Sequence, residues 1–273
     1  MRARAAWVAL ALAFVSRHAA ALDPFEIQVY DGTANAPGTA GLELHVNRVF
    51  NGLTTGASPE LPMNHQSHFT LEPSIGLTPF WELGGYFQTA LRADGTFDYA
   101  GVKLRSKFVT PPHWQPHLRL GVNLELSILP DTYDRGRWGG ELRPIVAWEN
   151  SLWLFAVNPI VDFSFAGPDA SAGPTLQPAA MAKVKIADTV AVGLEYYADL
   201  GPIAGLAPVR DQAHYLYEAA DLISIPHFEL NVGVGEGLTG ASNAVVAKMI
   251  LGYVWEREEK PVTHDVARVR SRR

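Results

Sequence analysis

The stretch His117–Ile128, with the sequence HLRLGVNLELSI, decides the fold class of this 273-residue chain. Arg119, Asn123 and Glu125 fall on odd positions, while the even positions of the stretch hold only leucine, valine and isoleucine. Side chains on a β-strand point alternately to opposite faces, so this strand has one charged face and one aliphatic face. That combination is typical of a transmembrane β-barrel, with lipid outside and water or ion pairs inside.

The same unit, roughly ten alternating residues followed by a turn, recurs from residue 38 to residue 255. We therefore expect an all-β fold, a single antiparallel transmembrane barrel of the outer-membrane type. An even number of strands is the rule for single-chain bacterial barrels. The pattern predicts twelve strands, at 39–51, 65–75, 80–91, 96–108, 117–128, 138–149, 152–163, 176–187, 189–198, 212–222, 227–236 and 244–255.

The predicted connections alternate between short turns and longer loops, as they do between the periplasmic and external ends of such barrels. Tight turns are expected at 76–79, 149–151, 188 and 224–226, and long loops at 52–64, 129–137, 164–173, 199–211 and 237–243. The order breaks only around the fourth strand. There Asp94-Gly95 predicts a tight hairpin turn, and the connection 109–116 is longer than a periplasmic turn should be.

Both ends of the chain lie outside this repeat. Arg2 and Arg4 precede a short apolar run, and Ala19 and Ala21 form an A-x-A site, so residues 1–21 are expected to be a cleaved signal peptide. The predicted location is the outer membrane. Residues 22–37 are interpreted as an N-terminal lead-in that can tuck into the lumen, and residues 256–273 as a charged, disordered periplasmic tail.

Composition narrows the function classes. The chain contains no cysteine, which excludes disulfides, thiolate metal sites and a cysteine nucleophile. A net charge of −6 argues against nucleic acid as a partner. The expected partners are the bilayer, with its lipopolysaccharide, and a small-molecule solute. We expect no cofactor and no metal, and the sequence leaves the oligomeric state open.

On each predicted strand, one face carries the charged residues, and we expect this face to line the lumen. The numbers of acidic and basic residues on these faces are nearly equal. The Asp94-Gly95 turn sets a register in which Glu82 faces about residue 105, and the turn at 76–79 brings Glu72 beside Glu82. Arg105 would then lie near two carboxylates. The predicted lumen residues are Glu43, His45, Glu72, Glu82, Lys103, Arg105, Lys107, Arg119, Glu125, Glu141, Arg143, Asp162, Lys183, Lys185, Glu195, Glu229 and Lys248.

Two functions are compatible with these charges. They can line a path that selects a small solute by charge, which makes the protein a channel or transporter. Alternatively they form ion pairs that fill the lumen of a structural barrel, because buried charges must be paired. We take the channel as the function hypothesis and the filled barrel as its alternative. The one-signed stretch Lys103-Arg105-Lys107 would favour anionic or polar solutes if it met water.

The segment Asn64-His65-Gln66-Ser67 is the one candidate for catalysis. His65 and Ser67 would share the lipid-facing side of a strand, and the pair resembles the His-x-Ser pair of outer-membrane phospholipase A. That resemblance implies a lipid-facing serine hydrolase, but the orienting asparagine is missing between residues 80 and 91. A polar loop edge is the preferred interpretation. His65 and His68 have no third ligand nearby for a metal.

A broader resemblance covers most of the chain after residue 25. The order EIQVYDG, GLELHVNRVFNG, LEPSIGLTPFWELGGYFQ and AGVKLRSKFV resembles the outer-membrane proteins grouped with the phenol-degradation meta-pathway transporters. In that family an acidic residue stands before a YGIT-like turn and another after it, and Glu72 and Glu82 take those places. The resemblance implies a barrel that passes small, hydrophobic or aromatic compounds, and it assigns no catalytic residue.

Overall fold

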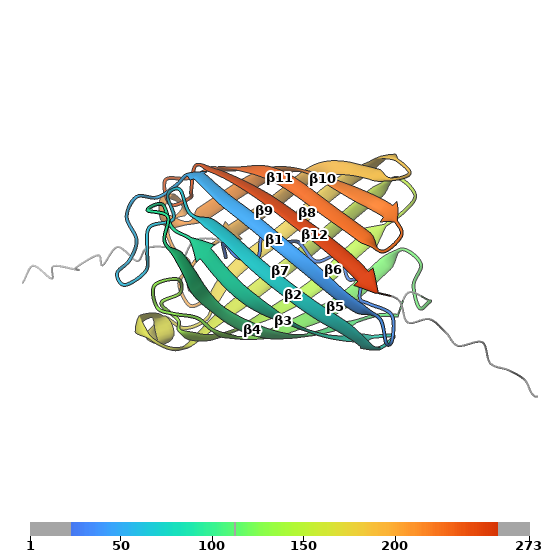
Figure 1. Cartoon of the computed structure of the whole chain (residues 1–273), viewed down its shortest axis with the longest axis horizontal. Coiled ribbons are helices and arrows are strands. Elements are labelled where there is room, and N and C mark those ends of the chain that lie inside the picture. The colour runs from blue at the N-terminus through green and yellow to red at the C-terminus, as the bar shows by residue number, and fades with distance from the viewer. Residues whose placement is uncertain (1–22, 112, 256–273) are drawn as a thin grey trace, which may run out of the picture.

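A computed structural model describes residues 23–111 and 113–255 (Figure 1). The expected signal peptide, 1–21, and the expected tail, 256–273, lie outside the described residues. The strands are β1 (Ala40–Asn51), β2 (Ser67–Thr78), β3 (Trp81–Leu91), β4 (Phe97–Val109), β5 (Leu118–Ile128), β6 (Trp138–Glu149), β7 (Trp153–Ala166), β8 (Thr175–Ala187), β9 (Val190–Asp199), β10 (Ala213–Ile225), β11 (Phe228–Gly237) and β12 (Val245–Trp255). Two short 3-10 helices, η1 (Pro168–Ser171) and η2 (Val209–Asp211), lie in connections.

The strands form a closed antiparallel barrel, which confirms the predicted fold class. Each strand pairs with its neighbours in sequence, and β1 closes the barrel on β12 with Ala40 opposite Trp255. Closure leaves no sheet edge with unpaired backbone groups, which a bilayer could not satisfy. Among the described residues, no helix is long and apolar enough to cross a membrane.

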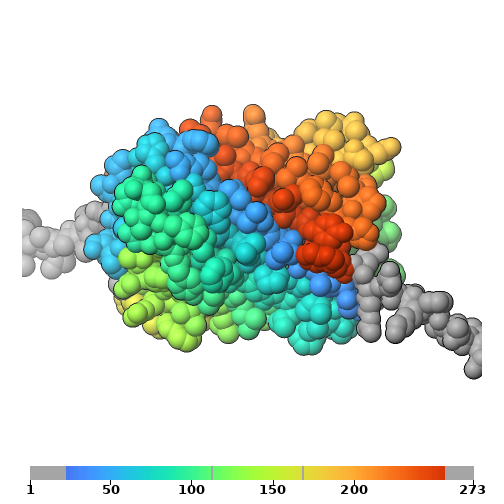
Figure 2. Space-filling view, in the orientation of Figure 1, coloured from blue at the N-terminus to red at the C-terminus, as the bar shows by residue number. Residues whose placement is uncertain are grey.

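The period-two alternation separates an apolar outer face from a polar inner one, as the sequence predicted. On β5, Leu124 and Leu126 are 44% and 61% exposed, whereas Asn123 and Glu125 are 0% and 4% exposed. The exposed positions form the barrel surface seen in Figure 2. Because the apolar side chains face outward and the charged ones inward, the centre of the barrel is polar.

The two ends of the barrel differ. We call the end with Ala40 and Trp255 the turn end, because the short connections gather there, and the opposite end the loop end. The predicted exceptions around β4 are both present. Gly95 adopts a φ of 87° in a tight turn at the loop end, and the connection from Val109 to Leu118 is long although it lies at the turn end.

The predicted boundaries of the second strand were wrong by two to three residues. The strand begins at Ser67 and continues through Gly76 to Thr78, so residues 76–78 are strand and not turn. Backbone hydrogen bonds explain the extension, because Gly38 N donates to Gly76 O (2.8 Å) and Gly76 N donates to Thr39 O (3.0 Å). The chain that precedes β1 therefore prolongs β2.

The predicted pairing of Glu82 with Arg105 in register was also wrong. Glu82 lies opposite Lys107, and Gly84 lies opposite Arg105. A β-bulge between Gln88 and Thr89 contributes to this shift, and Gly101 on β4 adopts a φ of 131° at that point. Such backbone conformations are strained for residues with a Cβ, which is why glycine occupies the bulge.

Residues 23–37, which we call the lumen segment, run through the barrel from the loop end to the turn end. Asn47, near the loop end of β1, donates from Nδ2 to Pro24 O (2.8 Å), while Gly38 pairs with Gly76 at the turn end. Phe25 and Ile27 are each only 1% exposed. The barrel core is therefore built from wall side chains packed around the chain's own N-terminal residues.

Candidate functional site: the lumen and its N-terminal segment

Most of the predicted inward-facing charges form ion pairs with one another. Of the predicted lumen residues, all except Asp162 and Glu229 take part in ion pairs within the described ranges. Several of these side chains are nearly fully buried, and a buried charge is tolerated only when it is paired. The pairs form groups that each join several strands, some of them across the lumen.

Arg105 occupies the centre of the first group, between the two carboxylates that the sequence placed near it. Its Nε lies 2.5 Å from Glu72 Oε1, and its Nη1 lies 2.7 Å from Glu82 Oε1. Lys107 Nζ adds a contact of 2.9 Å to Glu82 Oε1. The acid before the turn and the acid after it, which carried the family resemblance, are thus bridged by one guanidinium group.

Three side chains of this region could in principle hold a metal ion. Atoms of Glu43, His45 and Glu72 lie within 4.8 Å of one another. His45 Nε2, however, lies 3.1 Å from Glu72 Oε2 and 3.4 Å from Glu43 Oε2, and Arg105 also contacts Glu72. The group as arranged is an ion-pair network.

The second group lies on β4, β5 and β6. Lys103 Nζ contacts Glu125 Oε2 at 3.3 Å, and Arg143 Nε donates to Glu141 Oε1 at 2.6 Å. The register places Asn123 opposite Arg143 and Glu125 opposite Glu141.

The third group centres on Glu195 of β9. Lys183 Nζ lies 2.8 Å from Glu195 Oε1, and Lys248 Nζ binds the other carboxylate oxygen. Tyr197 donates its hydroxyl to Glu195 Oε2 at 2.5 Å, and Asp221 Oδ2 accepts from Lys183 at 2.6 Å. The strands from β8 to β12 are therefore tied together from inside the barrel.

Near the turn end, Glu149 accepts hydrogen bonds from both Arg119 and Lys185. Arg119 also contacts the lumen segment, since its Nη2 lies 3.1 Å from Asp31 Oδ2. This group lies where the segment approaches the opening at the turn end.

The lumen segment is acidic and lies against cationic wall residues. Asp23, Glu26 and Asp31 are its only charged residues. Lys103 Nζ lies 2.6 Å from Asp23 Oδ2, and Arg143 Nη1 lies 3.2 Å from Glu26 Oε1. With the Arg119–Asp31 pair, each acid of the segment has a cationic partner on the wall.

The backbone of the segment is held by side chains. Within the described residues, no hydrogen bond joins the backbone of residues 24–36 to the backbone of a strand. Carbonyl oxygens of the segment instead accept hydrogen bonds from polar side chains on six strands. The donors are Asn47 to Pro24 (2.8 Å), Thr70 to Phe25 (2.9 Å), Lys248 to Ile27 (3.0 Å), Arg143 to Gln28 (3.3 Å), Asn158 to Tyr30 (3.0 Å) and Arg119 to Asp31 (2.7 Å).

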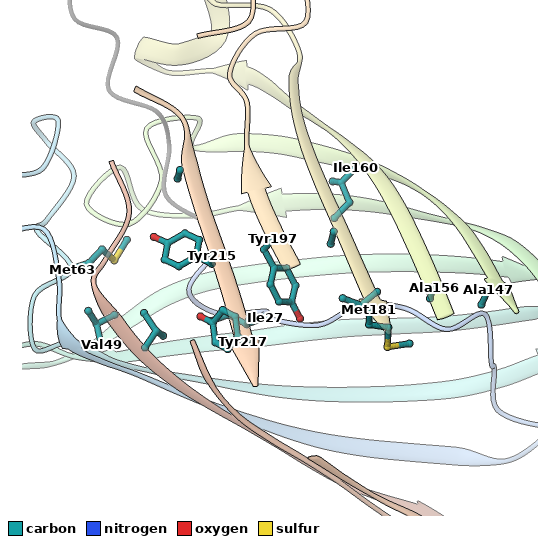
Figure 3. Close-up of a cluster of buried hydrophobic side chains, with 14 residues drawn as sticks. Ile27, Val49, Met63, Ala147, Ala156, Ile160, Met181, Tyr197, Tyr215 and Tyr217 are labelled. Carbon is teal, nitrogen blue, oxygen red and sulfur yellow. The ribbon is translucent and has the colours of Figure 1, made fainter. Parts of the chain in front are cut away.

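Apolar and aromatic wall residues surround the segment between these polar contacts. Figure 3 shows Ile27 beside Tyr215 and Tyr217, in a cluster of buried side chains that also includes Val49. A cavity of about 10 Å³, room for about one water molecule, lies between this part of the segment and the wall and is lined by these residues. The segment and the wall are therefore closely packed at this level.

Tyr30 contacts the wall through both its backbone and its ring. Its backbone N–H donates to Asn158 Oδ1 (2.7 Å) while its carbonyl accepts from Asn158 Nδ2. Its hydroxyl lies 2.7 Å from that of Tyr86, and the guanidinium of Arg143 lies 4.4 Å from its ring centroid. A cation placed over an aromatic ring is attracted by the ring's quadrupole.

The hydrolase candidate is not assembled as the sequence suggested. His65 precedes β2, is exposed and has a φ of 61°, so the strand alternation does not reach it. The prediction that His65 and Ser67 share a strand face was therefore wrong. Ser67 Oγ accepts a hydrogen bond from Arg48 Nη1 at 2.8 Å, and a serine activated as a nucleophile would instead donate to a base.

Sequence reasoning missed two lumen residues that share the inward parity of their strands. Asn158 lies two positions from the buried Ala156 on β7, and Asp221 lies two positions from the buried Ala219 on β10. Extending the alternation to every polar residue of those strands would have found both. No signal indicated that Asn158 binds the lumen segment, because that contact spans 128 positions in sequence.

Neither the known protein-family models nor the curated proteins contain a match to this chain. Solved structures do. The COG4313 outer membrane channel from Pseudomonas putida F1 superposes with a TM-score of 0.55 at 13% identity, over 84% of this chain and 100% of that one. The KdgM porin gives 0.52 at 8% identity, over 79% and 99% of the two chains.

The NanC porin is similar to the same extent, with a TM-score of 0.51 at 8% identity over 80% of this chain and 99% of that one. At such identities the likeness defines the fold alone. The chain is thus a twelve-stranded antiparallel barrel of the outer-membrane type.

Proposed function

We propose that this protein is an outer-membrane channel for a small solute, closed in the described state by its own N-terminal segment. The loop end would face outside and the turn end the periplasm, because long loops are external in barrels of this type. The solute would pass along the charged wall once the lumen segment is withdrawn.

One observation carries this proposal: in the described part of the chain, residues 24–36 are bound to the wall by side chains, and backbone pairing with the wall begins only at Pro37, opposite Gly76. A strand integrated into the sheet would lose a ladder of backbone hydrogen bonds on leaving, whereas residues 24–36 have none to lose. The wall cations that the segment contacts also keep partners of their own. Lys103 retains Glu125, and Arg143 retains Glu141, so withdrawal leaves no unpaired wall charge there.

Gly32 lies where the segment leaves the lumen. It adopts a φ of 78°, and a Cβ at this position would lie 2.9 Å from Arg119 Cβ. Glycine meets both requirements, the left-handed backbone and the close approach to the wall. The chain can therefore turn at Gly32 and reach the turn end beside β2.

Single-channel recording in planar bilayers tests the proposal on the full chain. The variant Glu26→Gln, Tyr30→Ala, Asp31→Asn removes the charges of two acids, with their three ion pairs to the wall, and the aromatic anchor without altering a strand. Charged hydrogen bonds contribute roughly 1.5–3 kcal/mol each, so we expect the open fraction to rise by at least about tenfold. Thr33→Ala is the matched control, because Thr33 is exposed and, among the described residues, its side chain forms a hydrogen bond only with Asp31 of the segment itself.

The competing function, a structural barrel with a filled lumen, makes the opposite prediction. If the triple variant folds, as judged by its heat-dependent migration on a gel, and shows no openings at any potential, the channel proposal is wrong.

A further inference from the structure

We propose that the solute accepted by this lumen is a short acidic oligopeptide, and that residues 23–31 occupy the place of such a peptide in the closed state. This inference rests on the proposed channel function and adds the chemical class of the solute. The wall contacts of the segment carry it, because they recognise features that any acidic peptide shares.

The first of these features is a row of backbone carbonyls. Six of the nine carbonyl oxygens between Asp23 and Asp31 accept a hydrogen bond from a wall side chain. The donors come from β1, β2, β5, β6, β7 and β12, and so surround the segment. A peptide chain, with its regularly spaced carbonyl acceptors, can satisfy these wall donors. An aromatic hydrocarbon has no hydrogen-bond acceptor with which to do so.

The second feature is the amide pair at Tyr30. Asn158 accepts a hydrogen bond from the N–H of Tyr30 and donates one to the C=O of Tyr30, so one side chain binds both backbone groups of a single residue. This two-point contact needs a donor and an acceptor in the arrangement that a peptide backbone supplies. An oligosaccharide acid has no backbone amide to satisfy it.

The third feature is the spacing of negative charge. Lys103, Arg143 and Arg119 meet the carboxylates of Asp23, Glu26 and Asp31 at successive levels between the loop end and the turn end. A solute with carboxylates a few residues apart can engage two of these cations at once. Such a solute also replaces the charge that the segment removes when it withdraws.

Three neutral wall side chains strengthen the argument. Asn47, Thr70 and Asn158 form their side-chain hydrogen bonds only with the lumen segment, within the described residues. All three are fully or almost fully buried, at 0–1% exposure. A buried polar group left without a partner is costly, so the open lumen would favour a solute that satisfies these groups.

Competition in planar bilayers tests the inference on the full-chain triple variant of the preceding section. A synthetic peptide with the sequence of residues 23–32, added on the turn side, should block its openings. In a second peptide, glutamine replaces Glu26 and asparagine replaces Asp31. We expect this peptide to block at least about tenfold less strongly. Adding Asn158→Ala to the channel should weaken the block by about five- to tenfold. The neighbouring outward substitution Val157→Ala should leave the block unchanged.

Liposome swelling then tests whether the lumen accepts acidic peptides in general, and not only the sequence of its own N-terminal segment. Vesicles containing the triple variant should swell faster with the tripeptide Glu-Val-Glu than with Lys-Val-Lys or with a neutral disaccharide. Equal rates, or faster entry of the sugar, would overturn the peptide assignment while leaving the channel intact. Absence of any openings contradicts the channel proposal instead, so the two failures are distinguishable.

Discussion

Arg105 links three neighbouring strands, β2, β3 and β4, through one buried guanidinium group. Its side chain is 2% exposed and bridges Glu72 and Glu82. Removing one partner of a buried ion pair leaves an uncompensated charge, at a cost of about 3–5 kcal/mol. We expect Arg105→Gln to lower the free energy of unfolding by about 3 kcal/mol, the low end of that range, because His45 and Lys107 still contact the two carboxylates.

Urea unfolding in lipid vesicles measures this effect, and Lys107→Gln is its control. Glu82 keeps Arg105 when Lys107 is neutralised, so we expect that loss to be only about 1–2 kcal/mol. Equal losses in the two variants would contradict the central role of Arg105.

At the scale of elements, the loop between β1 and β2 covers the loop end above the lumen segment. Leu61 packs against the cluster that contains Phe25, and its N–H donates to Thr132 O at 2.9 Å. Arg135 Nη1 donates to Ser58 O at 3.1 Å. Two loops of the loop end are therefore joined where the segment begins.

Glu60 makes this loop sensitive to pH. Burial, reinforced by the charges of Asp134 and Asp169 and opposed by Arg135, raises the pKa of Glu60 from 4.5 to about 7. A carboxyl with a raised pKa binds its proton more tightly in the folded loop. Its contribution to loop stability is therefore complete below about pH 4.5 and is lost as the pH rises through about 7.

Limited proteolysis of the loop, corrected with an unstructured reference peptide, measures this dependence. We expect cleavage within residues 52–66 of the wild-type protein to be faster at pH 8 than at pH 5. The Glu60→Gln variant should be cleaved at both pH values at the slow rate that the wild-type protein shows at pH 5. A wild-type rate that does not change with pH would exclude the effect.

The strands and the lumen segment differ in how far the sequence predicts them. Alternation located all twelve strands, because each strand separates a polar inner face from an apolar outer one over many residues. The positions of the predicted turns at Asp94-Gly95 and 76–79 placed Arg105 near Glu72 and Glu82, and Arg105 contacts both. The β-bulge at Gly101 escaped prediction, because a single extra residue leaves the alternation on either side intact.

The path of the lumen segment could not be predicted in the same way. Its contacts, such as that of Tyr30 with Asn158, join residues far apart in sequence through single side chains, and they follow no period. The acids Asp23, Glu26 and Asp31 were visible in the sequence, but their partners are fixed by the closed barrel.

At the scale of the whole molecule, the proposed orientation predicts which end is reached from outside the cell. The chain has no cysteine, so single cysteines can be introduced at exposed positions of each end. With an impermeant maleimide applied to intact cells, we expect Thr55→Cys at the loop end to react and Ser151→Cys at the turn end to react only after lysis. The reverse result would show that the barrel is inverted.

The side-chain contacts of the lumen segment also bear on how the barrel is assembled. Pairing β1 with β12 joins the two ends of the described sheet, the most distant strands in sequence, and the entropy cost of closing a chain rises with its length. Pro24 accepts from Asn47 on β1, and Ile27 accepts from Lys248 on β12, so the segment holds both strands of this seam. During biogenesis, we expect residues 23–37 to act as an internal template around which the first and last strands, β1 and β12, meet.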